Sequence, residues 1–190
     1  MFIDYVPLLL INMAVGLILL AGYLLRGIDS AGQKNWACGF LISGIVALIF
    51  GAHMAITWPL PGSYNVAFGQ MSVLLGVLFL GAGLSLANNW SLFSVATYGF
   101  FASIAAVIIG VRIINLKMTQ EPLMSGIGFI FTGLSGILIL PALKEKKLKW
   151  FKVIAAILLI SSSLIWLRTC YSAYWHHLSG MSNWKPLTMR

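Results

Sequence analysis

The segment Thr57-Trp-Pro-Leu-Pro-Gly-Ser-Tyr-Asn-Val-Ala-Phe-Gly-Gln70 separates two apolar stretches, residues 36–56 and 71–88, and it carries no charged side chain. Each flanking stretch has about 20 residues, which is the length a helix needs to cross the roughly 30 Å hydrocarbon core of a bilayer. Soluble domains do not combine two such stretches with a charge-free loop. The segment therefore predicts a helical hairpin inside a membrane.

The composition extends this prediction to the whole chain. Of 190 residues, 60% are hydrophobic and 8% are charged, and the mean hydropathy is +0.96. These values indicate a single-domain, all-α integral membrane protein. Apolar runs bounded by charges, Gly and Pro predict a six-helix transmembrane bundle with helices at residues 5–25, 36–56, 71–88, 91–114, 123–143 and 150–174, followed by an aromatic outer tail at 175–190. The first run is too long for a signal-peptide core, so we expect it to be retained.

The basic side chains predict the orientation. Most of the net charge of +8 lies in short segments between apolar runs, and the densest cluster is Lys144, Lys146, Lys147 and Lys149. Loops rich in lysine face the cytoplasm and its anionic lipid, which explains the charge without a nucleic-acid partner. We therefore expect both termini and the charge-free loop to face outward.

An internal similarity suggests a possible repeat. The run Gly39-Phe-Leu-Ile-Ser-Gly44 resembles Gly128-Phe-Ile-Phe-Thr-Gly133. Two halves of three helices each would have opposite orientations, so a 3+3 inverted repeat is predicted, as in transporters. Recurrence of Gly and Ser by chance is the alternative. Small residues four apart also predict close helix packing.

The three histidines are all predicted at the outer side. Neutral imidazole is the commonest metal ligand, so His53 together with His177 or His176 predicts a haem b or copper site. On an upright helix His177 would stand about 12 Å above His53, so a shared site requires a tilted helix or a folded-back tail. Hydrogen-bonded histidines at the interface are the alternative.

Three further residues complete the predicted cofactor site. Arg168 would neutralise a haem propionate or a quinone oxygen, unless it only reaches toward lipid headgroups. Trp58 and Tyr64 would form the wall of the pocket, because the two prolines between them prevent a helix. A plain connecting loop is the alternative. Glu121 is expected on the same side, where it would pair with Arg112 or Arg168.

Several blocks of the sequence resemble one family. They are Phe2-Ile-Asp-Tyr5, Leu8-Leu-Leu-Ile-Asn-Met-Ala14, His53-Met, Thr57-Trp-Pro-Leu-Pro-Gly-Ser-Tyr-Asn65 and Ala67-Phe-Gly69. This pattern is similar to domain-of-unknown-function family 981, a family of small prokaryotic membrane proteins. The resemblance implies a multi-pass protein of a prokaryotic cell membrane and transfers no activity.

Three classes of function stay open at this point. The first is a haem- or metal-binding redox protein for electron transfer, with quinone as a partner. The second is a transporter or channel for small solutes or ions, with a midplane site formed by Asn12, Ser43, Thr132 and Ser161 to Ser163. The third is a structural subunit bound to another membrane subunit. The sequence has no nucleotide-binding loop and no Ser-His-Asp set, which argues against a kinase or hydrolase.

Overall fold

The computed structural model describes residues 4–28, 30–144 and 149–185. Its long helices are α1 (Val6–Gly22, continued by the π-helix η1, Tyr23–Gly27), α2 (Ala37–Thr57, after the 3-10 turn η2, Gln33–Trp36), α3 (Met71–Asn88, after the π-helix η3, Asn65–Gln70), α4 (Phe93–Leu116), α5 (Pro122–Lys144) and α6 (Lys149–Gly180). All six are long and apolar enough to cross a membrane. The protein is therefore a multi-pass, all-helical membrane protein in contact with lipid. Lys146, Lys147 and residues 186–190 lie outside the described residues.

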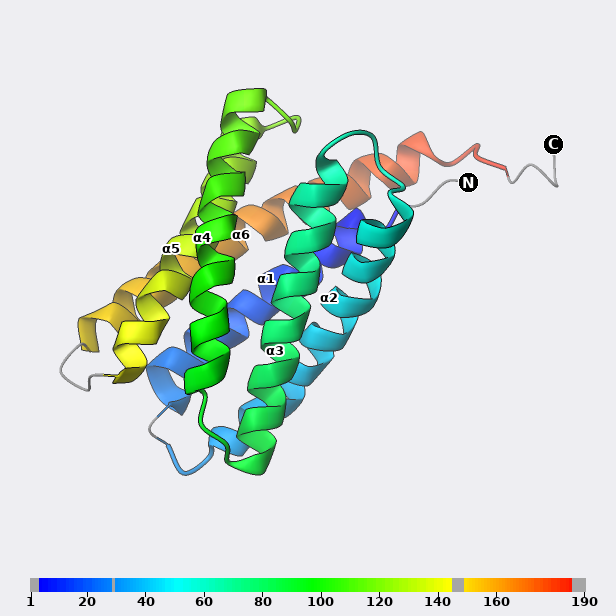
Figure 1. Ribbon diagram of the computed structural model, residues 1–190. Coiled ribbons are helices and arrows are strands. Elements are labelled where there is room, and N and C mark those ends of the chain that lie inside the picture. The colour runs from blue at the N-terminus through cyan, green and yellow to red at the C-terminus, as the bar shows by residue number, and fades with distance from the viewer. Residues whose placement is uncertain (1–3, 29, 145–148, 186–190) are drawn as a thin grey trace.

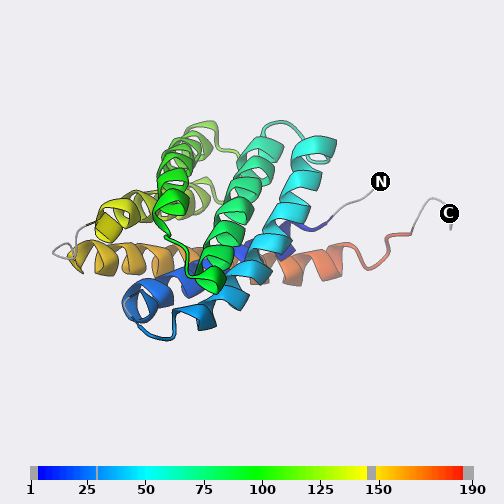
Figure 2. The ribbon, with the colours of Figure 1, turned by 60° about the horizontal axis from the view of Figure 1, so that its bottom comes forward.

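The helices form a pair and two hairpins. Helices α1 and α6 pack side by side, although they are far apart in the sequence, and the hairpins α2–α3 and α4–α5 stand over this pair (Figures 1 and 2). We call the end with residues 4–5, 58–64, 117–121 and 177–185 the terminal end. The opposite end, with residues 26–28, 30–36, 89–92, 144 and 149, is the basic end.

Close backbone contacts hold both hairpins together. A Cβ atom on Gly76 of α3 would lie 2.6 Å from the backbone nitrogen of Leu48 in α2. A Cβ atom on Gly110 of α4 would lie 2.6 Å from the carbonyl oxygen of Gly126 in α5. Between helices in lipid, attraction comes from such close packing, so glycine is required at these contacts. Gly51 belongs to the predicted stripe of small residues four apart, Ser43, Ala47 and Gly51, and a Cβ atom on it would lie 2.8 Å from the backbone nitrogen of Val73 in α3, so the predicted close packing is confirmed there.

The helix pairing gives no support to the predicted inverted repeat. Gly44 and Gly133 are equivalent in that repeat, which matches α2 with α5 and α3 with α6. A Cβ atom on Gly44 would meet the backbone nitrogen of Leu80 in α3 at 2.7 Å, whereas one on Gly133 would meet the carbonyl oxygen of Ser103 in α4 at 2.5 Å. The matched glycines therefore face non-equivalent helices.

The α-helix predicted at residues 71–88 is α3, and the π-helix η3 extends it back to Asn65, because only the segment with the two prolines is kept out of helix. One predicted boundary was wrong. The last helix, expected to end at residue 174, continues to Gly180, and no Pro or Gly interrupts it earlier. The expected tail at 175–190 is thus helical in its first part. At 32 residues, α6 is about 48 Å long, so its last turns reach beyond a 30 Å core.

Polar side chains inside the bundle bind neighbouring backbones. The amide of Asn12 donates to the carbonyl oxygen of Ser43 at 2.9 Å, and the Ser162 hydroxyl donates to that of Gly128 at 2.9 Å. The Ser163 hydroxyl donates to the carbonyl oxygen of Ala14. These bonds join α1 to α2, α5 to α6 and α1 to α6, so residues expected to line a transport site act as links between helices.

Candidate functional site

A cavity of about 520 Å³ lies at the terminal end of the bundle. We call it the outer cavity. Its wall is formed by α6, the start of α1, the loop before η3 and the loop between α4 and α5. The lining side chains are Val6, Pro7, Leu10, Leu60, Tyr64, Phe68, Thr119, Gln120, Glu121, Ser125, Trp166, Arg168, Thr169, Ser172, Ala173, His176 and His177.

One face of α6 supplies the largest part of this wall. Trp166, Thr169, Ala173 and His176 follow each other at three- and four-residue steps, which places them on the same side of a helix. The run reaches His176 only because α6 continues past residue 174. The longer helix therefore brings both C-terminal histidines to the cavity.

The two cavity histidines have defined tautomers. His177 Nδ1 lies 2.8 Å from a carboxylate oxygen of Asp4, and His176 Nδ1 lies 2.7 Å from the backbone oxygen of Ser172. Both partners accept hydrogen bonds, so in each ring Nδ1 carries the proton. In a neutral ring Nε2 is then the hydrogen-bond acceptor.

His53 and Trp58 do not line the outer cavity, unlike the other four predicted site residues. His53 Nδ1 is hydrogen-bonded to the Tyr5 hydroxyl at 3.0 Å, and burial raises the pKa of that hydroxyl. Tyr5 follows Asp4, the partner of His177, so the start of the chain connects His53 to the cavity rim. Trp58 ends α2 in the left-handed conformation with φ 50°.

An ion pair forms one side of the cavity rim. The Arg168 guanidinium donates two hydrogen bonds to the Glu121 carboxylate, at 2.6 and 2.8 Å. Of the two expected partners of Glu121, Arg168 is the one it binds. The hydrogen bonds from Arg168 hold the pKa of Glu121 below its ordinary value. The two charges of this pair therefore compensate each other.

The side chain of Trp166 brings a buried indole nitrogen to the wall of the outer cavity. The side chain is 1% exposed, and Nε1 has no hydrogen-bond partner within the described parts of the chain. Its ring packs edge-to-face on Phe129 with centroids 5.2 Å apart, and Phe68 and Tyr64 continue the aromatic wall. A buried indole N–H is normally hydrogen-bonded, so this donor stands out as unsatisfied within the described residues.

Sequence reasoning missed two residues of this site. Trp166 was not among the predicted site residues, although its position three residues before Thr169 on an apolar helix was a usable signal. Asp4 was not among them either, because its bond to His177 joins residues 173 positions apart. No local pattern predicts such a contact.

The donor atoms of the described residues form no ready metal centre. No group of three or more His, Cys, Asp or Glu side chains in residues 4–28, 30–144 and 149–185 is close enough to hold a metal ion. A metal ion at this end would therefore be coordinated by two histidines alone, or by histidines together with atoms of a bound ligand.

Comparison with known proteins identifies the family. A family model described as "Protein of unknown function (DUF981)" matches residues 1–180. The chain belongs to the DUF981 family. The resemblance expected from the loop and its flanking blocks is thereby confirmed. No curated protein and no solved structure matches this DUF981 chain.

Proposed function

We propose that this DUF981 protein binds a membrane-soluble quinone or quinol in the outer cavity, with the terminal end facing outward. The observation that carries the proposal is the unpartnered Nε1 of Trp166 in the cavity wall. A buried donor without a partner is unfavourable by about 1–3 kcal/mol, and a carbonyl oxygen of a bound ligand removes that penalty.

The chemistry of the cavity fits such a head group. Its volume of about 520 Å³ lies within the range of roughly 300–1,000 Å³ for small-molecule sites. The stacked rings of Tyr64 and Phe68 give it a flat aromatic side. Nε2 of His176 and of His177 would accept from quinol hydroxyls, while Trp166 would donate to a quinone carbonyl.

The charge of the rim favours a neutral ligand. Among the described lining residues the charged ones are Glu121 and Arg168, and they bind each other with two hydrogen bonds. An anionic group such as a haem propionate would have to displace Glu121 from Arg168. A quinone carries no charge and leaves this pair intact.

Binding of a benzoquinone with a methyl substituent in place of a tail tests the proposal. The assay is equilibrium dialysis of the protein in nanodiscs, with empty nanodiscs as background. Trp166→Phe removes one hydrogen bond of about 0.5–1.5 kcal/mol, so its Kd should rise about two- to tenfold. Trp90→Phe, at the basic end, should leave the Kd unchanged. Absence of binding to the unsubstituted protein, or equal Kd values for both variants, would refute the proposal.

A haem b or copper centre is the second candidate. The specific observation in its favour is that Nδ1 of His176 and His177 donates to an oxygen, which is how metal-binding histidines are usually oriented. His53 and His177, the predicted ligands, are joined through Tyr5 and Asp4. Metal analysis and an absorbance spectrum test this candidate. A Soret band or bound copper that is lost in His177→Ala supports it. Absence of both signals from the unsubstituted protein excludes it.

A further inference from the structure

Two smaller cavities continue inward from the outer cavity. The first, of about 70 Å³, shares Val6, Leu10 and Phe68 with the outer cavity, and we call it the middle cavity. The second, of about 130 Å³, is the inner cavity. The middle and inner cavities share four lining residues, Leu75, Leu78, Ser103 and Thr132. The three cavities therefore have common walls from the terminal end into the bundle.

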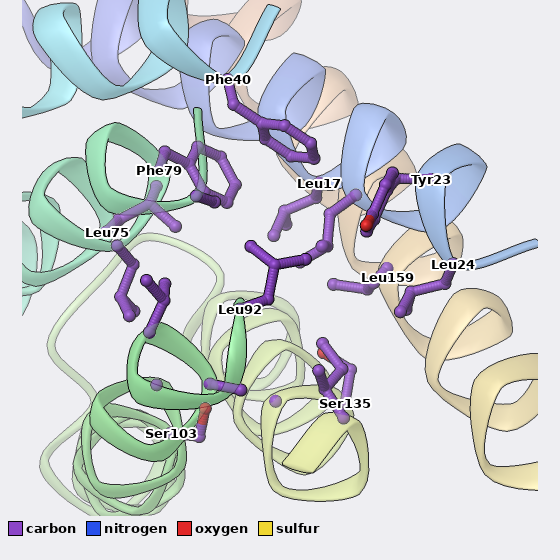
Figure 3. A pocket seen from close by; sticks show the side chains of 18 of the residues that line it. Leu17, Tyr23, Leu24, Phe40, Leu75, Phe79, Leu92, Ser103, Ser135 and Leu159 are labelled. Carbon is purple, nitrogen blue, oxygen red and sulfur yellow. The ribbon is translucent and has the colours of Figure 1, made fainter. Parts of the chain in front are cut away.

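The lining changes from polar to apolar along this series. The outer cavity has histidines, an ion pair and an indole N–H, whereas the inner cavity is walled mainly by leucines and aromatic rings. Figure 3 shows Leu17, Leu159 and Phe79 converging on the inner cavity from α1, α6 and α3. Ser103 and Ser135 lie along one side. Such a surface can pack against a hydrocarbon chain, but it has no charged partner that would offset the cost of removing a charged ligand from water.

The dimensions of the series fit one hydrocarbon chain. Along α1 the apolar lining extends from Leu10 to Leu24, which at 1.5 Å per residue is about 21 Å. A lipid chain covers one leaflet, about 15 Å of the hydrocarbon core. An engineered cavity of about 150 Å³ holds one benzene, so the 70 Å³ middle cavity admits a single chain and not two side by side.

We propose that the ligand is a single-tailed amphiphile whose head occupies the outer cavity and whose tail passes through the middle cavity into the inner cavity. This inference rests on the proposed function, since it names the tail of the molecule that the outer cavity binds. The lining residues that neighbouring cavities share, and the change from polar to apolar lining, support this occupant. A two-tailed phospholipid and an empty, merely under-packed core are the competing outcomes.

The test uses a benzoquinone whose decyl tail ends in a photoreactive diazirine. After illumination in nanodiscs, peptide mass spectrometry locates the labelled residues. We expect labels on Leu17, Leu75 or Leu159 of the inner cavity wall. Labels confined to lipid-facing side chains such as Ile49 and Ile108 would overturn the inference.

Two matched substitutions on α3 sharpen the result. Ala82 lines the inner cavity, and Ala87 is exposed on the same helix. Ala82→Leu should lower inner labelling about tenfold, because overfilling a packed site is unfavourable by about 1–3 kcal/mol. Ala87→Leu should not change it. If Ala82→Leu does not fold, Ala96→Leu on α4 blocks the same cavity, and equal inner labelling in blocked and control variants overturns the inference.

The two proposals fail in different ways. The methyl-substituted benzoquinone should compete with the photoprobe for the outer cavity. If it competes while the tail labels only lipid-facing residues, the head site stands and the tail route is wrong. If it neither binds nor competes, the proposed function itself is wrong. Labelling by a two-tailed phospholipid probe at the inner cavity would contradict the single-tail inference.

Discussion

Asn65→Ala should destabilise the loop that forms one wall of the outer cavity. Asn65 is 0% exposed. The prolines at positions 59 and 61 keep this loop out of a helix, and the Asn65 side chain supplies hydrogen bonds to its backbone. Its Oδ1 accepts from the backbone nitrogen of Leu60 at 3.0 Å, and its Nδ2 donates to the carbonyl oxygens of Leu60 and Gly62. Alanine removes all three bonds and leaves the backbone groups of Leu60 without these partners.

The size of the effect follows from these bonds. Each contributes about 0.5–1.5 kcal/mol, so the loss is about 3 kcal/mol. For a chain of this length that corresponds to a fall in Tm of about 6–12 °C. Because Tyr64 precedes Asn65, benzoquinone binding should weaken as well.

Thermal unfolding in a mild detergent, followed by circular dichroism, measures the shift in Tm. Asn88→Ala is the matched control, since Asn88 is exposed and makes one bond, to the carbonyl oxygen of Leu84. The control should unfold within about 0.5 kcal/mol of the unsubstituted protein. If Asn65→Ala and Asn88→Ala unfold at the same temperature, Asn65 does not organise the loop and our reasoning about this wall is wrong.

Two further outcomes are expected. The pKa of Glu121 is lowered in the folded state, so its contribution to stability is present above the ordinary pKa of 4.5 and is lost as the pH falls through the lower folded pKa. Thermal unfolding measured from pH 6 to pH 3 should therefore show a steeper loss of stability for the unsubstituted protein than for Glu121→Gln. Parallel curves for the two proteins would contradict this expectation. For the orientation, an impermeant thiol reagent on intact cells should label a cysteine placed at Ser63 but not one placed at Lys146 in a cysteine-free background, and the reverse pattern would show that the bundle is inverted.

The spans and the packing were predictable because they depend on local composition. Twenty apolar residues between polar segments determine a transmembrane helix wherever they occur, so the six spans followed from the sequence. The close contact of Gly51 with α3 followed from the spacing of small residues in the same way. These properties require no knowledge of which helices are neighbours.

The site was predictable only in part because it depends on helix pairing. Arg168, His176, His177 and Tyr64 share a cavity, as the prediction that they lie at one end of the bundle implied. The separation of His53 from that cavity depends on how α2 packs beside α1, which hydropathy does not report. The structure gives no evidence for the inverted repeat, since the similar runs of small residues occur in helices with different neighbours.

The pairing of α1 with α6 explains why the cavity lies at the terminal end. A polar side chain in the hydrocarbon core is unfavourable unless it has a partner, so polar lining is tolerated where the helices leave the core. Helix α6 extends beyond that depth, and α1 begins beside it, so Asp4 reaches His177 at 2.8 Å. Further inside, the same two helices present leucines, and the series of cavities becomes apolar with depth, like the bilayer around it. A ligand that fits this gradient has its polar head at the interface and its tail in the core, which is the orientation that a quinone or any other single-tailed lipid already has in the membrane.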